Sequence, residues 1–300
     1  YLRIQTQDIA RWRELVVDGL GMATGSGPDP DGLYLRLDER RARLIVLPGD
    51  TDKAQAVGWE VRDHFALQRV REAVEKAGIA VEELSLEEAD YRDAEKVIAF
   101  DDPAGTRVEV FFGPVLDHSP VVTPHGGRWV TGEQGLGHVV LPTAKFAESY
   151  AFYTEVLGMR LSDWLDEAGV WFHVNTDHHV MALVDVGYAH FHHLAFETVD
   201  IGKMRDMLDH VARHGRWLGW GPTRHGIAGN IASYVRIVEE ECFVELYCDM
   251  EQLQEDHVAR VYPDDRYSSN TWGPLPPRSC PKWQSSSDIS GMKSSSRRTP

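Results

Sequence analysis

The stretch TGEQGLGHVVLPTAKFAESYAFYTEVLGM, residues 131–159, decides how the second half of this chain folds. Its short apolar run beginning at His138 predicts a β-strand, and the residues after it have the spacing of an amphipathic helix. A Gly-Met pair at residues 158–159 is typical of a helix end. The stretch therefore predicts a strand that carries one histidine and is followed directly by a helix.

The same order of elements also opens the chain. Residues 1–22 predict a short strand, an amphipathic helix and a second Gly-Met helix end. Tyr1 to Met22 spans 21 positions. His138 to Met159 also spans 21 positions. The two stretches therefore have the spacing of internal copies.

Two later positions keep the same spacing when counted from Tyr1 in one copy and from His138 in the other. Ala56 and His193 both lie 55 positions later. Glu109 and Glu245 lie 108 and 107 positions later, respectively. A duplicated module of one strand, one helix and three strands accounts for this pattern, so we predict an α+β fold built from tandem copies.

The remaining elements are predicted from local patterns. Alternation of apolar and polar residues over 33–49 indicates a pair of half-buried strands. Further strands are expected over residues 56–61, 96–113, 171–175, 178–186, 190–200 and 232–249. Helices are expected over residues 66–78 and 201–215.

Shifts in composition divide the chain. Residues 113–135 are rich in Gly and Pro, and residues 274–300 are rich first in Pro and then in Ser. The predicted organisation is an N-terminal metal-free domain, a linker, a C-terminal metal-binding domain and a disordered tail, over residues 1–120, 121–134, 135–273 and 274–300.

The composition excludes some classes of function. A net charge of −16 without a clustered basic face argues against a nucleic-acid partner. No run of 18 apolar residues exists and the first residues do not resemble a signal peptide, so we expect no membrane partner. Cys242 and Cys248 are expected to be buried free thiols, and with Cys280 they are too few for a disulfide framework. These features predict a cytoplasmic protein.

Three residues at matching positions of the repeat suggest a metal site. Two neutral imidazoles, His138 and His193, and one carboxylate, Glu245, form a donor set that suits a divalent metal with open positions, such as Fe(II). Alternate residues of neighbouring strands point the same way, so the three can converge on one face of a curved sheet. The first copy has Tyr1 and Ala56 in place of the histidines, which predicts one metal site per chain.

Further polar residues lie near these strands. His179 is the second histidine of a pair at the start of a strand, and Tyr234 follows His225 by nine positions. A histidine near a metal is a natural acid or base, and a tyrosine hydroxyl can hydrogen-bond an anionic oxygen.

With 14 histidines in the chain, most are expected to have ordinary structural roles. His178 and His192 precede the candidate residues and are expected to point to the opposite face of their strands. No role is expected for the histidines in loops or on helix surfaces, which are His118, His125, His210 and His214. Residues 239–241 are expected to form a solvated acidic turn.

Several segments together resemble a known family. They are WVTGEQGLGH (129–138), FYTEVLGM (152–159), the His-His apolar run (192–196), GPTRHG (221–226) and FVELY (243–247). This set resembles the type I extradiol ring-cleavage dioxygenases, members of the vicinal-oxygen-chelate (glyoxalase-like) superfamily of paired βαβββ modules. The resemblance extends to about Gly273.

The resemblance implies a non-heme Fe(II), or Mn(II) in a minority of relatives, held by His138, His193 and Glu245. It implies extradiol cleavage of a catecholic substrate with incorporation of both atoms of dioxygen, the co-substrate, in the degradation of aromatic compounds. His179 matches the family's acid–base histidine. His225 and Tyr234 match residues that contact the substrate oxygens. A homo-oligomer is also implied.

Two departures leave the substrate open between 2,3-dihydroxybiphenyl and alkyl or aryl catechols. Residues 226–228 are Gly-Ile-Ala where biphenyl enzymes usually have Asn-Asp, and the segment 160–178 is short, which predicts a reduced pocket loop. Two other functions are alternatives. One is a glyoxalase- or epimerase-type enzyme that uses the metal as a Lewis acid, and the other is a metal-free binding protein of the bleomycin-resistance kind.

Overall fold

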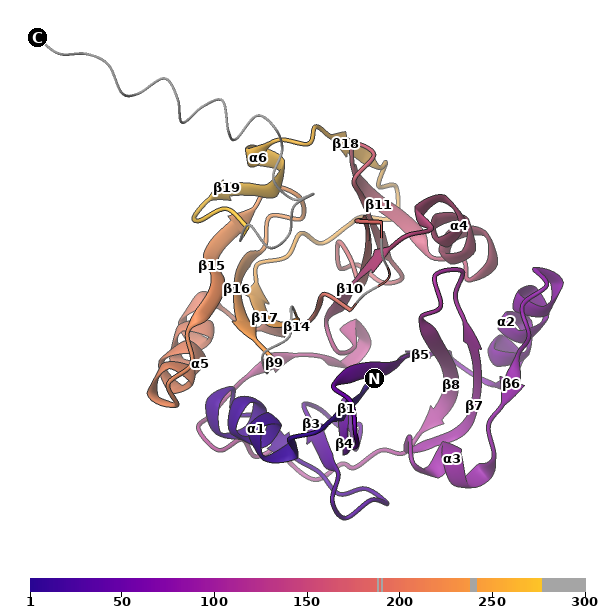
Figure 1. Cartoon of the computed structure of the whole chain (residues 1–300), viewed down its shortest axis with the longest axis horizontal. Helices are drawn as coiled ribbons and strands as arrows, with labels where there is room; N and C mark the ends of the chain where they lie inside the picture. The colour runs from indigo at the N-terminus through magenta and orange to yellow at the C-terminus, as the bar shows by residue number, and fades with distance from the viewer. Residues whose placement is uncertain (188, 190, 238–241, 277–300) are drawn as a thin grey trace, which may run out of the picture.

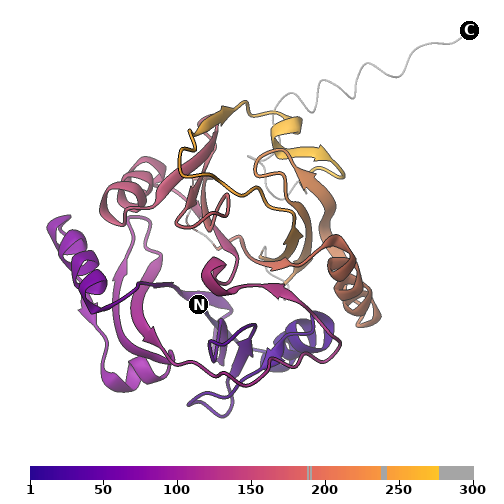
Figure 2. The same cartoon turned by 180° about the vertical axis from the view of Figure 1, so that it is seen from behind.

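Two curved β-sheets lie side by side with helices on their outer faces in the computed structural model of the chain (Figures 1 and 2). The structure describes residues 1–187, 189, 191–237 and 242–276. Within them, an eight-stranded sheet has the order β2-β3-β4-β1-β5-β8-β7-β6. An 11-stranded sheet has the order β18-β11-β12-β13-β10-β14-β17-β16-β15-β19, with β9 paired to β14.

The first sheet comes from two successive βαβββ modules. The first module consists of β1 (Leu2–Thr6), α1 (Ile9–Arg13) continued by the π-helical turn η1 (Glu14–Gly19), β2 (Ala23–Thr24), β3 (Leu33–Arg36) and β4 (Leu44–Pro48). The second consists of β5 (Lys53–Glu60), α2 (His64–Lys76), β6 (Glu82–Glu83), α3 (Leu86–Asp90), β7 (Ala94–Asp101) and β8 (Arg107–Pro114).

The second sheet repeats this arrangement. Its first module consists of β10 (His138–Thr143), α4 (Phe146–Ala151) continued by η3 (Phe152–Val156), β11 (Arg160–Leu165), β12 (Gly169–His173) and β13 (Met181–Asp185). Its second consists of β14 (His193–Thr198), α5 (Ile201–Arg213), β15 (Leu218–His225), β16 (Ile231–Arg236) and β17 (Phe243–Cys248). Outside the modules lie β9 (Trp129–Val130), η2 (Gly132–Gln134), β18 (Arg260–Tyr262), α6 (Arg266–Ser269) and β19 (Asn270–Trp272).

Strand pairing confirms the predicted α+β fold of paired βαβββ modules. In the first half, β1 pairs parallel with β4 and antiparallel with β5, and β5 pairs parallel with β8. In the second half, β10 pairs parallel with β13 and antiparallel with β14, and β14 pairs parallel with β17. Each sheet therefore joins its two modules through their first strands.

The first helix of each half ends with the same backbone geometry. Gly21 and Gly158 both have a backbone φ of 73°, a conformation that glycine adopts without steric cost. In each copy this glycine follows a π-helical turn, over Glu14–Gly19 and Phe152–Val156. The Gly-Met signals at residues 21–22 and 158–159 therefore correspond to real helix ends.

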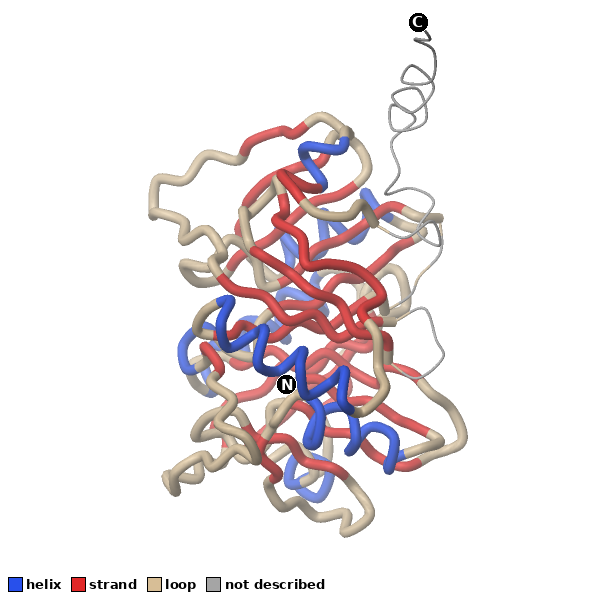
Figure 3. The backbone as a smooth tube through the Cα atoms, turned by 90° about the vertical axis from the view of Figure 1, so that its left-hand side faces the viewer, coloured by secondary structure: helices blue, strands red, loops and turns tan. Residues whose placement is uncertain are grey.

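The two halves share a continuous hydrophobic core, to which α5 contributes Met204, Met207 and Val211. Figure 3 shows helices lying along the outside of the strands. Phe100 of the first half meets Phe152 of the second edge-on, with ring centroids 6.0 Å apart. The buried hydroxyl of Tyr153 donates a hydrogen bond to Asp102 Oδ2 at 2.9 Å. The halves are therefore packed as neighbours.

Some local expectations were wrong. The strands within 33–49 are not half-buried: every residue of β3 is buried, because its two faces pack on different apolar clusters, around Leu35 and Tyr34. The short segment 160–178 contains the strand β11, which was not expected. The segment 113–135 carries the strand β9, paired to β14. Cys242 is only partly buried, whereas Cys248 is buried as expected.

The predicted division at 1–120, 121–134 and 135–273 remains a proposal, which the two separate sheets support. Most of the tail 274–300, together with Cys280 and residues 239–241, lies outside the described part of the chain. Among the described residues, none of the helices has the length and apolar content needed to cross a membrane.

Candidate metal centre and its cavity

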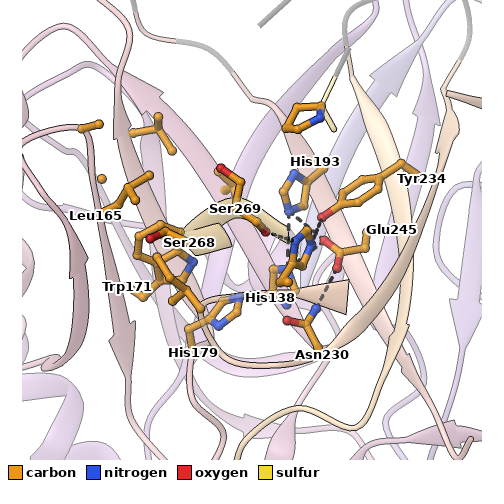
Figure 4. A pocket seen from close by; sticks show the side chains of 18 of the residues that line it. His138, Leu165, Trp171, His179, His193, Asn230, Tyr234, Glu245, Ser268 and Ser269 are labelled. Atoms are coloured by element: carbon orange, nitrogen blue, oxygen red, sulfur yellow. Dashed lines mark hydrogen bonds and ion pairs between the residues drawn. The ribbon is translucent and has the colours of Figure 1, made fainter. Parts of the chain in front are cut away.

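Three adjacent strands bring His138, His193 and Glu245 together. In the sheet register His138 of β10 lies opposite Ala195 of β14, which in turn lies beside Glu245 of β17. His193 lies two residues before Ala195 and therefore points to the same face. Figure 4 shows the three side chains converging at one end of a pocket.

The ligand atoms have the spacing that one ion requires. Glu245 Oε2 lies 3.1 Å from His138 Nε2 and 3.0 Å from His193 Nε2, and the two Nε2 atoms are 3.4 Å apart. Ligand atoms about 2.1 Å from one ion and at right angles to each other would lie about 3 Å apart. The three side chains fit one face of an octahedral divalent ion and leave its other positions open.

The protonation states also suit a metal. Burial lowers the pKa of His193, which favours the neutral imidazole that coordinates metals. Burial alone would raise the pKa of Glu245, but the facing His138 and His193 lower it well below its usual range. An ionised Glu245 beside a neutral His193 is a donor state that suits metal binding.

Further side chains fix the orientation of two of the three candidate ligands, Glu245 and His193. Asn230 donates a hydrogen bond from Nδ2 to Glu245 Oε1 at 3.2 Å. His192 Nδ1 lies 2.6 Å from His193 Nδ1, so the nitrogen of His193 that faces away from the site is engaged. Such outer hydrogen bonds set ring orientation and tautomer in metal sites.

The three other candidate residues lie beside this cluster. The ring of His179 is 4.3 Å from that of His138, centroid to centroid. Burial, followed by the charge of His138, lowers the pKa of His179 well below its usual value. His225 Nε2 lies 2.7 Å from the hydroxyl of Tyr234. Burial and the nearby Glu245 raise the pKa of Tyr234 well above its usual value, which keeps the phenol neutral.

A pocket with an empty volume of about 660 Å³, part of it open to solvent, lies over these residues. Besides the polar groups, its walls are mainly apolar, and they include Leu165, Trp171, Val184, Trp220, Ile227 and Pro276. Such a pocket suits a flat apolar ligand that carries polar groups at the metal end. His178 and His192 are buried and do not line it, and each contacts the following histidine through Nδ1.

The matching position in the first half contains an ion pair in place of this donor set. Arg92 donates to both oxygens of buried Glu109, at 2.8 and 2.6 Å, and the Tyr1 hydroxyl donates to Glu109 Oε2 at 2.6 Å. A Cβ atom on Gly58 would lie 2.4 Å from the Tyr1 ring, so glycine is needed there. This arrangement supports one metal site per chain.

A second cluster of potential ligands comprises Asp163, His178 and Glu251. Arg260 already pairs with both of its carboxylates, with Nη2 at 2.7 Å from Asp163 Oδ2 and 2.6 Å from Glu251 Oε2. The cluster is therefore a salt-bridge network around a guanidinium group.

Several residues of the site were not predicted from the sequence. Asn230 lies between His225 and Tyr234, so its place in that segment was a usable signal. Trp220 stacks on Tyr234 with ring centroids 4.4 Å apart. Ser269 places its backbone carbonyl 3.1 Å from His225 Nδ1. Trp220 and Tyr234 are paired across the consecutive strands β15 and β16, whereas the contact of Ser269 with His225 joins segments 44 positions apart and has no local sequence signature.

Comparisons with known proteins agree with this fold and site. Residues 1–49 match the family model "Dihydroxybiphenyl dioxygenase BphC D1". Residues 135–236 match the model of the glyoxalase, bleomycin resistance protein and dioxygenase superfamily. The fold and site thus define an oxygenase-type member of the glyoxalase-like proteins.

Comparisons with individual proteins identify the family within this class. The chain is 34% identical to a biphenyl-2,3-diol 1,2-dioxygenase of Pseudomonas sp. (strain KKS102), over 73% of this chain and 79% of the relative. It is 46% identical to an iron-dependent extradiol dioxygenase of Rhodococcus jostii (strain RHA1), over 54% of each chain. The crystal structure of 2,2',3-trihydroxybiphenyl 1,2-dioxygenase from Sphingomonas wittichii strain RW1 matches with a TM-score of 0.77 and 26% identity, over 91% of this chain and 96% of the other. The chain belongs to the extradiol dioxygenase family.

Proposed function

We propose that this protein is an Fe(II)-dependent extradiol dioxygenase that cleaves a substituted catechol beside its two hydroxylated carbons. The observation that carries the proposal is the spacing of 3.0–3.4 Å among three buried ligand atoms at the end of an apolar pocket. Family membership supports it, and the name of the Rhodococcus relative includes iron dependence.

His138, His193 and Glu245 would hold the ion. A bound Fe(II) would supply a redox-active Lewis acid with open positions for the catechol and for dioxygen, and Mn(II) could occupy the same donors. The chain provides the rest of the chemistry. The apolar walls hold the ring and exclude water, which strengthens the electrostatic interactions at the polar end.

Proton transfers are assigned to side chains around the ligands. His179, neutral because burial lowers its pKa, accepts a proton from a catechol hydroxyl and can return it later in the reaction. Tyr234 and His225, which hydrogen-bond each other at 2.7 Å, orient the substrate oxygens. Both oxygen atoms of dioxygen would end in a ring-opened, yellow product, one in a carboxylate and the other in an aldehyde or ketone.

The direct test is to load the protein anaerobically with Fe(II), to add 3-methylcatechol or 2,3-dihydroxybiphenyl in air, and to record absorbance and oxygen uptake. Yellow product with one dioxygen consumed per catechol would establish ring cleavage, and the ratio of the two rates would show which ring size the pocket prefers. Bound metal without colour or oxygen uptake would contradict the proposal and favour a Lewis-acid reaction.

The same preparation tests two further expectations. Measuring activity with Fe(II) and with Mn(II) identifies the working metal. Light scattering of the metal-loaded protein checks the expected homo-oligomer.

A further inference from the structure

A line of hydrogen bonds leads from a buried carboxylate to the proposed acid–base residue. Asp163 Oδ2 lies 2.8 Å from His178 Nε2, and His178 Nδ1 lies 3.0 Å from His179 Nδ1. At most 5% of any of the three side chains is exposed. Solvent therefore has little access to these hydrogen bonds. Which atom donates and which accepts in each of them is determined by groups inside the protein.

The carboxylate end of this line can only accept hydrogen bonds. Arg260 donates to Asp163 from Nη2 at 2.7 Å and from its backbone N–H at 2.7 Å. Burial opposes ionisation of Asp163, but hydrogen bonds from His178 and Arg260 lower its pKa. An ionised carboxylate has no proton to give. Nε2 of His178 must therefore carry a proton and donate it to Asp163.

The direction of the hydrogen bond from His178 to Asp163 determines the direction of the hydrogen bond between His178 and His179. A neutral imidazole carries one proton, so His178 with a proton on Nε2 has a bare Nδ1 that accepts. The two Nδ1 atoms lie 3.0 Å apart, so one of them must donate a hydrogen bond to the other. Since Nδ1 of His178 accepts, Nδ1 of His179 carries the proton and donates it. In neutral His179 the proton on Nδ1 leaves Nε2 as a bare lone pair, and this ring lines the pocket (Figure 4).

We propose that Asp163 and His178 are positioning residues that hold His179 in the tautomer with a proton on Nδ1, so that Nε2 accepts the substrate proton. This inference deepens the proposed function and rests on it for the identity of the proton donor. The catechol O–H bond breaks and an N–H bond forms at Nε2. The resulting imidazolium keeps its Nδ1 proton hydrogen-bonded to His178, whose own proton is directed to Asp163.

The segment that follows β17 covers this line of hydrogen bonds. Asp163 belongs to β11, and Arg260 belongs to β18, which pairs with β11 in parallel with these two residues opposite each other. The backbone N–H of His178 donates to the carbonyl of Glu251 at 2.9 Å. The segment after β17 therefore returns to cover the line and to supply its guanidinium cap.

The experiment compares two isosteric changes in the same cluster, Asp163→Asn and Glu251→Gln. Each replaces a carboxylate that contacts Arg260 with an amide. The amide NH₂ introduced by Asp163→Asn can donate to His178 Nε2, which reverses the hydrogen bonds and places the proton of His179 on Nε2. We expect Asp163→Asn to lower kcat about 10²-fold with iron content unchanged and KM within about twofold. Glu251→Gln leaves the line intact, so its kcat should stay within about twofold of the unmodified protein.

A second measurement needs no turnover. Long-range ¹H–¹⁵N spectra of the metal-free full-length chain distinguish the two histidine tautomers, and loss of signals in His179→Phe assigns those of His179. In the unmodified protein, we expect His179 to have a protonated Nδ1 and an unprotonated Nε2. In Asp163→Asn, we expect an unprotonated Nδ1 and a protonated Nε2. A protonated Nε2 in the unmodified protein would overturn the inference, as would equal kcat values for Asp163→Asn and Glu251→Gln. Failure of the protein to cleave catechols would count against the proposed function, while the spectra would still decide the tautomer.

Discussion

Asn230 donates a hydrogen bond to Oε1 of Glu245 at 3.2 Å, while the other oxygen of Glu245 faces both candidate ligand histidines. The amide thus holds the carboxylate in the orientation that directs one oxygen to the metal position. Asn230 contacts the oxygen of Glu245 that is turned away from the two histidines, which suits a role in orientation.

Replacing Asn230 by Ala should weaken metal binding about 10- to 100-fold, because Glu245 loses the partner that fixes its rotation. Competition for Fe(II) against a chelator measures the change. Asn175→Ala, at an amide outside the pocket, is the control and should bind iron normally. Equal iron affinity in both variants would show that Asn230 does not orient the ligand.

Replacing His179 by Phe should leave iron bound and lower kcat by at least about 10²-fold, because the aromatic ring keeps the packing on His138 but removes the acid–base nitrogen. Iron content and steady-state oxygen uptake are the measurements. His210→Phe, on the surface of α5, is the control and should keep normal turnover. Normal turnover in His179→Phe would remove this residue from the mechanism.

Replacing Arg92 by Leu should destabilise the protein by about 1–3 kcal/mol, because buried Glu109 loses its two shortest contacts to a guanidinium group and keeps only the Tyr1 hydroxyl and a longer ion pair with Arg3. The double change Arg92→Leu and Glu109→Leu removes both charges and should recover most of that loss. Urea unfolding of the metal-free proteins measures the difference. A double variant as unstable as the single one would mean that packing of Arg92, and not its charge, matters.

Glu197 predicts a dependence of stability on pH. Burial, followed by the charges of Asp177 and Asp249, raises its pKa from 4.5 to about 8. The folded state therefore binds more protons than the unfolded state between these values, so stability is lost as pH rises from about 4.5 through 8. The slope from this group approaches about 1.4 kcal/mol per pH unit at most.

Glu197→Gln removes this titration while keeping the shape of the side chain. We expect the difference in unfolding free energy between Glu197→Gln and the unmodified protein to grow in favour of the variant from pH 5 to pH 8. A difference that stays constant over this range would show that Glu197 ionises normally in the folded protein.

The repeat made the fold and the three ligand candidates predictable. The spacing of 55 positions singled out His193, and the structure places its Nε2 atom 3.4 Å from Nε2 of His138. Periodic signals of this kind survive in a sequence because each module must bury the same faces. The metal roles of these residues, and the roles of His179, His225 and Tyr234, remain proposals.

Other parts could not be predicted because they depend on tertiary contacts. The strand β11 carries buried Ser162 and Asp163, which are poor local indicators of a strand. Their burial is possible because His178 and Arg260 satisfy Asp163, and Arg260 lies 97 positions away in the sequence. Nothing local to either residue indicates that partnership.

The ion pair between Arg92 and Glu109 also has a consequence for how the protein matures. The guanidinium group supplies the positive charge that Glu109 needs inside the first half, so this half can fold in the absence of iron. Removal of a bound metal from the second half would therefore leave this ion pair and the packing around it in place.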